Sequence, residues 1–300
     1  MTGVKNILIT GGSGFIGSNF LEYISDKKLN YKVASPTHKD LDILNLDKIK
    51  KNFDIFKPEV VINFVAYRDT TSAEKQRGDL KGFVWKTNVK GVENISNVCQ
   101  RYGVFLIHIS TDMIFSGLSD NPGPYNEDAK PEEKLENLSW YGWTKAEAER
   151  VLSDNKNVAI IRMGKPVAKT IYDPQLDYIG KILYLYDHEL PLFDDQYMTL
   201  TSAPSVFEVV EKLIDNKKTG VFHVASRDVF TPYELGKYLI NKVRGKIDAV
   251  KGRSIGEYLK KWPNRYPKYG GLLAKKTAEK LQVESLGWKE IVDLFLPFYE

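Results

Sequence analysis

The sequence predicts an α/β fold with a doubly wound parallel sheet and a smaller, mostly helical C-terminal lobe. Two observations support this prediction. Short runs of Val, Ile and Leu alternate with helical patterns through the first two thirds of the 300 residues. After residue 162 this alternation breaks, and most of the remaining pattern is helical. Near-continuous apolar strands separated by helices are typical of a parallel sheet that is covered on both faces.

The strand and helix patterns follow one another in a regular order. Strands are expected at residues 6–10, 31–35, 59–65, 104–110 and 158–162, with helices between them at residues 18–24, 46–56, 85–102 and 139–155. Right-handed crossovers between parallel strands place such helices on both faces of the sheet.

A glycine-rich turn joins the first strand to the first helix and contains Gly11, Gly14 and Gly17. Glycines let the backbone turn sharply and approach a pyrophosphate, whose charge rests on the N-terminal amides of the helix. Because the triplet follows a strand and precedes a helix, it indicates a dinucleotide site and a Rossmann-type sheet rather than a plain turn. Phe15 and Ile16 lie in the same turn and are counted with the cofactor-binding residues.

The pattern in the later part of the chain predicts a division into two domains. Helices are expected at residues 179–186 and 206–215, a strand that returns to the sheet at 220–225, and a loop at 262–271. We therefore expect a dinucleotide-binding domain at residues 1–165, to which 202–226 return. The substrate-binding lobe would comprise residues 166–201 and 227–300.

The composition is that of an ordinary globular protein, with 42% hydrophobic and 27% charged residues. The net charge of +4 comes from scattered lysines, so nucleic acid or membrane binding has little support, whereas an anionic substrate suits it. Cys99 is the single cysteine and excludes an intramolecular disulfide, which fits a reducing compartment. No apolar run of 18 residues and no leader is visible, so we expect a cytoplasmic protein. His108 and His223 lack partners at metal-ligand spacing, so no metal is expected and both are interpreted as core histidines.

Tyr141 and Lys145 stand four residues apart, on one face of the helix expected at 139–155. A neighbouring ammonium favours the phenolate, so we expect Lys145 to lower the pKa of Tyr141. Thr111 follows the buried strand at 104–110, and ligands of parallel sheets bind at the carboxyl ends of the strands. A tuned tyrosine beside such a hydroxyl could exchange a proton with a carbonyl compound. The alternative is an ordinary exposed helical pair.

On these residues the chain resembles the extended short-chain dehydrogenase/reductases, which act on nucleotide-sugars, over most of residues 4–226. Residues 110–117, 124–127 and 141–145 are similar to segments of dTDP-4-dehydrorhamnose reductases. The resemblance implies that Thr111 polarises the carbonyl group and that Tyr141 delivers the proton. It also implies that Lys145 holds the nicotinamide ribose.

The resemblance further implies cofactor contacts. The three glycines would face the pyrophosphate, Asp42 would border the adenine, and Ala66 would line the cofactor cleft. Ile43, next to Asp42, is counted with the cofactor-binding residues. Asn88 matches an asparagine common in the helices of the family, although a locally bonded helix residue is the alternative. Two segments depart from the family pattern, at residues 163–167 and 198–201, and affect the identity of the substrate more than that of the cofactor.

The end of the second strand bears on the choice of cofactor. No carboxylate occurs there before Asp40, whereas His38 and Lys39 could meet a 2′-phosphate. The sequence therefore favours NADP over NAD, with a solvated polar loop as the alternative interpretation.

The reaction class depends on the residue after Asp112. Dehydratases of the superfamily carry a glutamate there, whereas this chain has Met113, which cannot transfer a proton. Reduction of a nucleotide-linked 4-keto-6-deoxy sugar is the first hypothesis, with Tyr141 as proton donor. An epimerase and a non-catalytic NADP-binding regulatory subunit remain alternatives, and a homodimer is compatible with the sequence.

Overall fold

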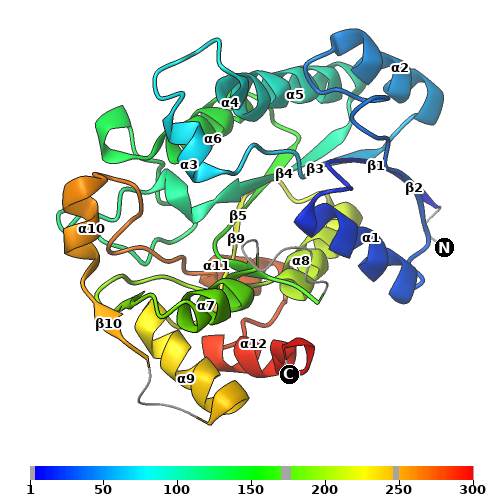
Figure 1. Cartoon of the computed structure of the whole chain (residues 1–300). Coiled ribbons are helices and arrows are strands. Elements are labelled where there is room, and N and C mark those ends of the chain that lie inside the picture. The colour runs from blue at the N-terminus through cyan, green and yellow to red at the C-terminus, as the bar shows by residue number, and fades with distance from the viewer. Residues whose placement is uncertain (1–3, 170–176, 246–249, 300) are drawn as a thin grey trace. The chain divides into compact units, whose positions relative to one another are not determined.

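The computed structural model describes residues 4–169, 177–245 and 250–299 (Figure 1). It contains two compact units. The first unit comprises residues 1–114, 139–161 and 210–221, and the second comprises residues 115–138, 162–209 and 222–300. Some residues of the predicted domains, namely 1–3, 170–176, 246–249 and 300, lie outside the described residues.

Strands and helices alternate up to residue 163. The elements are β1 (Lys5–Thr10), α1 (Phe15–Asp26), β2 (Tyr31–Ala34), α2 (Leu46–Phe56), β3 (Val60–Asn63), α3 (Thr70–Glu74), α4 (Phe83–Trp85), the π-helical turn η1 (Lys86–Lys90), α5 (Gly91–Tyr102), β4 (Phe105–Thr111), the 3-10 turns η2 (Asp112–Ile114) and η3 (Leu135–Asn137), α6 (Trp140–Leu152) and β5 (Val158–Met163).

The rest of the chain is mostly helical. Its elements are β6 (Pro166–Val167), α7 (Tyr178–Asp187), β7 (Leu192–Phe193), β8 (Thr201–Ser202), α8 (Ala203–Asn216), β9 (Gly220–Val224), α9 (Pro232–Arg244), β10 (Gly252–Arg253), α10 (Ile255–Lys261), α11 (Lys275–Leu281), α12 (Trp288–Phe295) and η5 (Leu296–Phe298).

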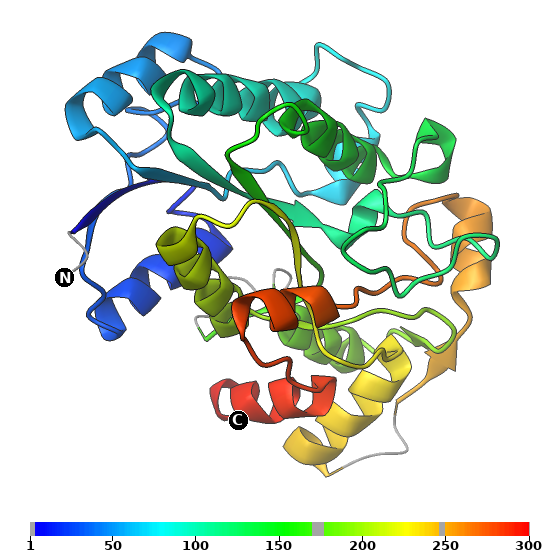
Figure 2. The same ribbon diagram turned by 180° about the vertical axis from the view of Figure 1, so that it is seen from behind.

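The main sheet has six strands in the order β2-β1-β3-β4-β5-β9, so the predicted return of the strand near residue 220 is confirmed. The pairs β1–β2, β1–β3 and β3–β4 are parallel, as predicted. In this register Asn63 stands opposite both Thr10 and His108. Figures 1 and 2 show α2, α5 and α6 over one face of strands β1 to β4, and α1 over the other. The doubly wound α/β prediction is therefore confirmed.

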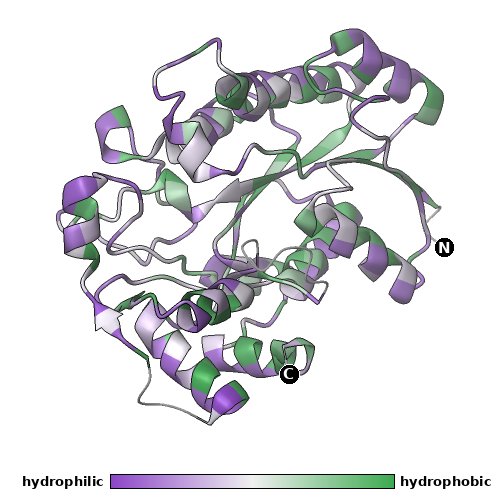
Figure 3. Ribbon diagram, viewed as in Figure 1, coloured by the Kyte–Doolittle hydropathy of each residue, from purple (hydrophilic) through white to green (hydrophobic). Residues whose placement is uncertain are grey.

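Each unit has an apolar core of its own. In the first unit the core joins the strands to α2, α5 and α6 through residues such as Leu8, Phe53 and Ile95. In the second unit α7, α9 and α12 pack together through residues such as Ile182 and Leu239. The hydropathy colouring in Figure 3 shows the strands of the first unit as mainly apolar segments. Buried strands of this kind explain the near-continuous Val and Ile runs in the sequence.

Some elements differ from the sequence prediction. The helix expected over residues 85–102 is divided into α4, the π-turn η1 and α5. A π-turn inserts one residue into the helical repeat and commonly occurs at functional sites. The prediction also missed α3 and the two-residue strands β6, β7, β8 and β10, which are too short to give a hydrophobic period. Among the described residues, no helix has the length and apolar character needed to cross a membrane.

The glycine turn can form only because its key residues have no Cβ atom. Gly11 has a φ of +74°, and a Cβ atom there would lie 2.8 Å from the backbone nitrogen of Val65. A Cβ atom on Gly17 would lie 2.3 Å from the carbonyl oxygen of Gly11. The turn closes because the Gly14 amide donates to that same carbonyl oxygen over 3.0 Å. The first turn of α1 therefore packs against the end of β1 without room for a methyl group.

Replacing Gly17 with alanine should lower the free energy of unfolding by about 1–3 kcal/mol, because the new methyl group would overlap rigid backbone. Gly256→Ala in α10 is the matched control, since its Cβ atom would meet only Ser254 Oγ at 3.2 Å. That variant should be neutral or more stable by up to about 1 kcal/mol. Urea unfolding measures both, and equal effects of the two substitutions would contradict this account.

Candidate active site

Tyr141 and Thr111 meet where α6 begins and β4 ends. Ser139 caps α6, its hydroxyl accepting from the Gly142 amide over 3.2 Å, so that Tyr141 lies in the first helical turn. The Thr111 side chain lies beside the Tyr141 phenol, close enough to lower the pKa of that group. Thr111 Oγ1 also lies 3.1 Å from an oxygen of the buried Asp112 carboxylate. The structure thus brings together two of the predicted catalytic residues, which lie 30 positions apart in the sequence.

Gly142 makes this meeting sterically feasible. A Cβ atom at this position would lie 2.2 Å from the carbonyl oxygen of Met113. The first turn of α6 can therefore approach η2 closely only because residue 142 has no side chain. Gly142 was not among the residues predicted from the sequence, although it lies within the Tyr141–Lys145 motif.

The pKa of Tyr141 shifts opposite to the sequence prediction. This pKa is raised to about 12, mainly by burial and also by the nearby Asp112 carboxylate. The Thr111 side chain and the Arg68 guanidinium act in the opposite direction. The expectation that Lys145 lowers the pKa of Tyr141 is therefore wrong for this structure: the charges that act on the phenol are those of Asp112 and Arg68.

Lys145 is buried on the same helix, with only 1% of its surface exposed. Its Nζ donates to the carbonyl oxygen of Ile109 over 2.7 Å and lies 3.1 Å from Nε2 of His108. Burial lowers the pKa of Lys145 to about 8, although the Glu149 carboxylate acts in the opposite direction. The amine is thus held against β4.

Asn88 joins the π-turn to two other elements. Its side-chain oxygen accepts from the Tyr67 amide over 2.7 Å, and its Nδ2 donates to the Tyr67 carbonyl oxygen over 3.0 Å. Nδ2 also lies 3.0 Å from Thr144 Oγ1 in α6. The alternative of a locally bonded helix residue is therefore wrong. Asn88 connects the loop after β3 to the helix that carries Tyr141.

The other predicted cofactor residues follow β1, β2 and β3. Gly14 is the N-cap of α1 and supplies no side-chain acceptor, so the first amides of this helix have no side-chain cap. Asp42 accepts from the Leu44 amide over 2.9 Å, and Ile43 is buried against Gly91. Ala66 is half-buried just beyond β3. An uncapped helix start beside a cradle that no Cβ atom fills is suited to a pyrophosphate. The residues present therefore fit a dinucleotide, and Phe15 and Ile16 begin that helix.

The two histidines that were interpreted as core residues are fully buried and bonded. Nδ1 of His223 lies 3.0 Å from the Leu273 carbonyl oxygen, and its Nε2 lies 3.4 Å from an Arg162 nitrogen. Burial, together with Arg162, lowers the pKa of His223 to about 3. In the part of the chain that the structure describes, no group of three His, Cys, Asp or Glu side chains could hold a metal ion.

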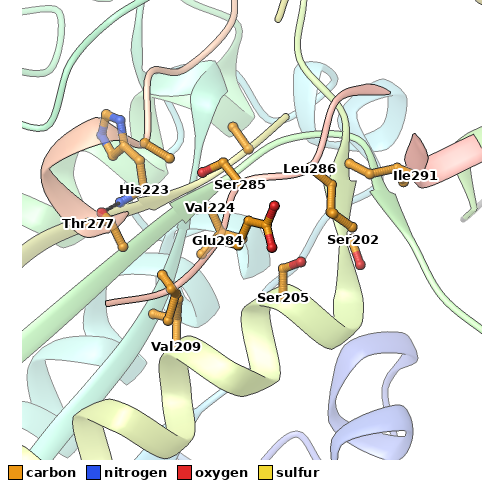
Figure 4. A pocket seen from close by; sticks show the side chains of 13 residues that line it. Ser202, Ser205, Val209, His223, Val224, Thr277, Glu284, Ser285, Leu286 and Ile291 are labelled. Atoms are coloured by element: carbon orange, nitrogen blue, oxygen red, sulfur yellow. Dashed lines mark hydrogen bonds between the residues drawn. The ribbon is translucent and has the colours of Figure 1, made fainter. Parts of the chain in front are cut away.

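A small pocket in the second unit contains Ser202, Ser205, His223 and Glu284 among its lining residues (Figure 4). Its volume is about 20 Å³, enough for about one water molecule. The pocket is therefore too small to hold a sugar nucleotide.

Comparison with known proteins assigns the family. The model of the RmlD substrate binding domain family matches residues 5–299. A dTDP-4-dehydrorhamnose reductase of Aggregatibacter actinomycetemcomitans is 33% identical over 268 residues, which cover 85% of this chain and 86% of that protein. The chain therefore belongs to the RmlD substrate binding domain family.

Two further relatives indicate how widely this fold is used. Methionine adenosyltransferase 2 subunit beta of Xenopus tropicalis is 28% identical over 249 residues, covering 77% of this chain and 70% of that protein. A crystal structure of dTDP-4-dehydrorhamnose reductase from Bacillus anthracis in complex with NADP matches with a TM-score of 0.84 and 23% identity. The match covers 98% of this chain and 99% of the chain in that crystal structure. At 23% identity it shows that the two proteins share a fold and nothing more.

The buried amine of Lys145 should be visible in the pH dependence of stability. Its pKa falls from 10.5 in an unburied lysine to about 8 in the folded chain. Between these two values the unfolded chain binds the extra proton, so the Lys145 contribution to stability rises as the pH rises. The unfolding free energy of the native chain, minus that of Lys145→Met, should increase by about 3 kcal/mol from pH 8 to pH 10.5. Parallel urea-unfolding curves across this range would contradict the assignment.

Proposed function

We propose that this protein is an NADPH-dependent reductase of a nucleotide-linked 4-keto-6-deoxy sugar. The observation that carries the proposal is the contact between Thr111 and Tyr141. Tyr141 lies on α6, the helix that also contains Lys145. The relative from Aggregatibacter actinomycetemcomitans, which bears the name of such a reductase, supports the assignment. When bound, NADPH would supply a hydride to the carbonyl carbon.

The phenol of Tyr141 would serve as the proton donor. Because its pKa is about 12, the group carries its proton throughout the neutral range. Thr111 lies beside this phenol, and its one hydroxyl hydrogen, which faces Asp112 in this structure, would turn to the substrate oxygen. As negative charge develops on that oxygen, the proton of Tyr141 can move to it.

The remaining residues would bind and orient the cofactor. Gly11, Gly14 and Gly17 offer a close approach for the pyrophosphate. Asp42 would border the adenine, Ala66 would line the cofactor cleft, and Ile43 is counted with the cofactor-binding residues. Lys145 would hold the nicotinamide ribose. The role of residues 166–201 and 227–300 in binding the sugar nucleotide belongs to the same proposal, as does a cytoplasmic homodimer.

Two other functions are kept as candidates. An epimerase of the same superfamily would use the same tyrosine and lysine but return the hydride to the sugar. A regulatory subunit is favoured by one observation, the likeness to methionine adenosyltransferase 2 subunit beta. The proximity of Thr111 to Tyr141, with Lys145 one turn further along the same helix, supports catalysis over that role.

Substituting Tyr141 with phenylalanine should lower turnover at least about 100-fold, because a general acid contributes about 10²–10⁴-fold in rate. NADPH binding should stay nearly unchanged, since the phenol is assigned to the substrate. The matched control is Tyr102→Phe, which removes a hydroxyl bonded to the Asp54 side chain. NADPH oxidation with dTDP-4-keto-6-deoxyglucose and NADPH fluorescence measure the two effects.

The same assay separates the candidate functions. A reductase oxidises one NADPH per sugar, whereas an epimerase converts the sugar with no net oxidation. Full activity of Tyr141→Phe would remove Tyr141 from the mechanism. No turnover with any nucleotide-sugar, together with stable binding of methionine adenosyltransferase, would favour the regulatory subunit.

The choice between NADP and NAD should depend on Lys39. His38 and Lys39 are exposed in the segment after β2, and Ser35 of that segment approaches the glycine turn: a Cβ atom on Gly12 would lie 2.0 Å from its hydroxyl. We therefore expect Lys39→Ala to raise the KM for NADPH about tenfold, because a cation is lost from the 2′-phosphate. The KM for NADH should hardly change. Lys32→Ala on β2 is the control, and an equal change for both cofactors would contradict the assignment.

A further inference from the structure

Four buried polar side chains form a continuous ladder across the first unit. Thr10 of β1 bonds Asn63 of β3, with 2.7 Å between Oγ1 and Oδ1. Asn63 Nδ2 lies 3.2 Å from His108 Nδ1 on β4, and His108 Nε2 lies 3.1 Å from Lys145 Nζ on α6. The exposed fractions of these four residues are 3%, 1%, 0% and 1%. The ladder thus joins the strand before the glycine turn to Lys145.

The direction of the hydrogen bonds is fixed at Asn63. The backbone amide of Val65 lies 3.1 Å from Asn63 Oδ1, and a backbone N–H can only donate. The side-chain atom that faces Val65 must therefore be the oxygen. It follows that the atom facing His108 is the amide nitrogen, which is a donor only.

This arrangement selects one tautomer of His108. Nδ1 must accept from Asn63, so it carries no proton, and the proton of a neutral imidazole lies on Nε2. Turning the ring over would place carbon atoms at both contacts, so the ring orientation is fixed as well. An imidazolium would set its Nδ1–H against the amide hydrogens of Asn63. Burial, together with Lys145, lowers the pKa of His108, which agrees with a neutral ring.

The proton on His108 Nε2 points at Lys145. An ammonium has only donors, so a protonated Lys145 would oppose the Nε2–H across 3.1 Å. A neutral amine presents a lone pair that accepts this proton, while one of its own hydrogens goes to the Ile109 carbonyl oxygen. We propose that His108, oriented by Asn63, is a positioning residue that shifts the protonation equilibrium of Lys145 toward the neutral amine.

The other groups around Lys145 act on the same equilibrium. Glu149, one turn further along α6, favours the ammonium, but its carboxylate also accepts from the Ser110 hydroxyl over 2.5 Å. From β4 the amine meets the Ile109 carbonyl oxygen and His108. Tyr141 lies one turn earlier and carries its proton at neutral pH. Among the groups that act on Lys145, the carboxylate of Glu149 is therefore the one that opposes the ladder.

The effect of the ladder on activity rests on the proposed function. If Lys145 must be an ammonium to donate to the ribose and to assist Tyr141, activity is lost as the pH rises through the pKa of Lys145. The ladder moves this alkaline limit toward neutral pH. His108 acts only through Lys145 in this scheme.

Asn63→Asp is the variant that reverses the ladder. One carboxylate oxygen still accepts from Val65, and the other accepts from His108, so the imidazole proton moves to Nδ1. Nε2 then accepts from an ammonium, and the midpoint for deprotonation of Lys145 should rise by about one pH unit or more. Thr10→Val is the matched control, because the Val65 amide still fixes Asn63 and the midpoint should not move.

Two spectra of the full chain test this without cofactor or substrate. Long-range 1H–15N correlations of labelled histidine report the tautomer, with the His108 signals identified by comparison with His108→Gln. We expect proton-bearing Nε2 and bare Nδ1 in the native chain. The Cε resonance of labelled Lys145, identified by Lys145→Met, reports its midpoint in the native chain and both variants.

A proton on Nδ1 of the native His108, or an imidazolium, would overturn the proposal whether or not the variants fold. A reversed tautomer in Asn63→Asp without a rise in the midpoint would also overturn it. The alkaline limb of kcat/KM for NADPH oxidation should follow the same midpoints. Absence of reductase turnover would contradict the proposed function alone, since the spectra still decide the state of Lys145.

Discussion

The close approach of α6 to the carboxyl end of β4 is the constraint on which the candidate site depends. It exists because Gly142 leaves space for the carbonyl oxygen of Met113, and because Ser139 starts the helix at that point. Without this approach, the Tyr141 phenol would not reach the Thr111 hydroxyl. The parallel sheet also contributes, because the carboxyl end of β4 lies beside that of β3, which is paired in turn with β1.

Burial sets the chemistry of this site more than pairing of charges does. It raises the pKa of Tyr141 and lowers that of Lys145, so it shifts the equilibrium of each group toward the neutral form. A protonated phenol suits a group that must give a proton to a developing alkoxide. The amine is linked instead to His108 and the main chain of β4. The two residues of the motif are thus controlled by different surroundings.

Much of the fold could be predicted because its causes are local or periodic. The helix α2 has the predicted boundaries, and the glycine turn lies where the strand–turn–helix pattern places it. The proximity of Thr111 to Tyr141 could also be predicted, because the sequence places Thr111 at the end of a strand and Tyr141 at the start of a helix. The partner of Lys145 could not be predicted, because four-residue spacing fixes a helical face but not the side chain across from it. The role of Asn88 in joining Tyr67 to Thr144 depends likewise on contacts between elements distant in the sequence.

Membership of the family leaves catalysis and regulation as distinct uses of one scaffold, because function resides in the site rather than in the fold. The central claim is that the Tyr141 phenol faces the reacting carbonyl beside the nicotinamide ring. The most direct measurement is a crystal structure with NADP and a nucleotide-linked sugar bound. We predict that Tyr141 Oη and Thr111 Oγ1 both lie within about 2.6–3.2 Å of the oxygen on C4 of the sugar. A sugar bound with its C4 oxygen out of reach of both hydroxyls would contradict the account.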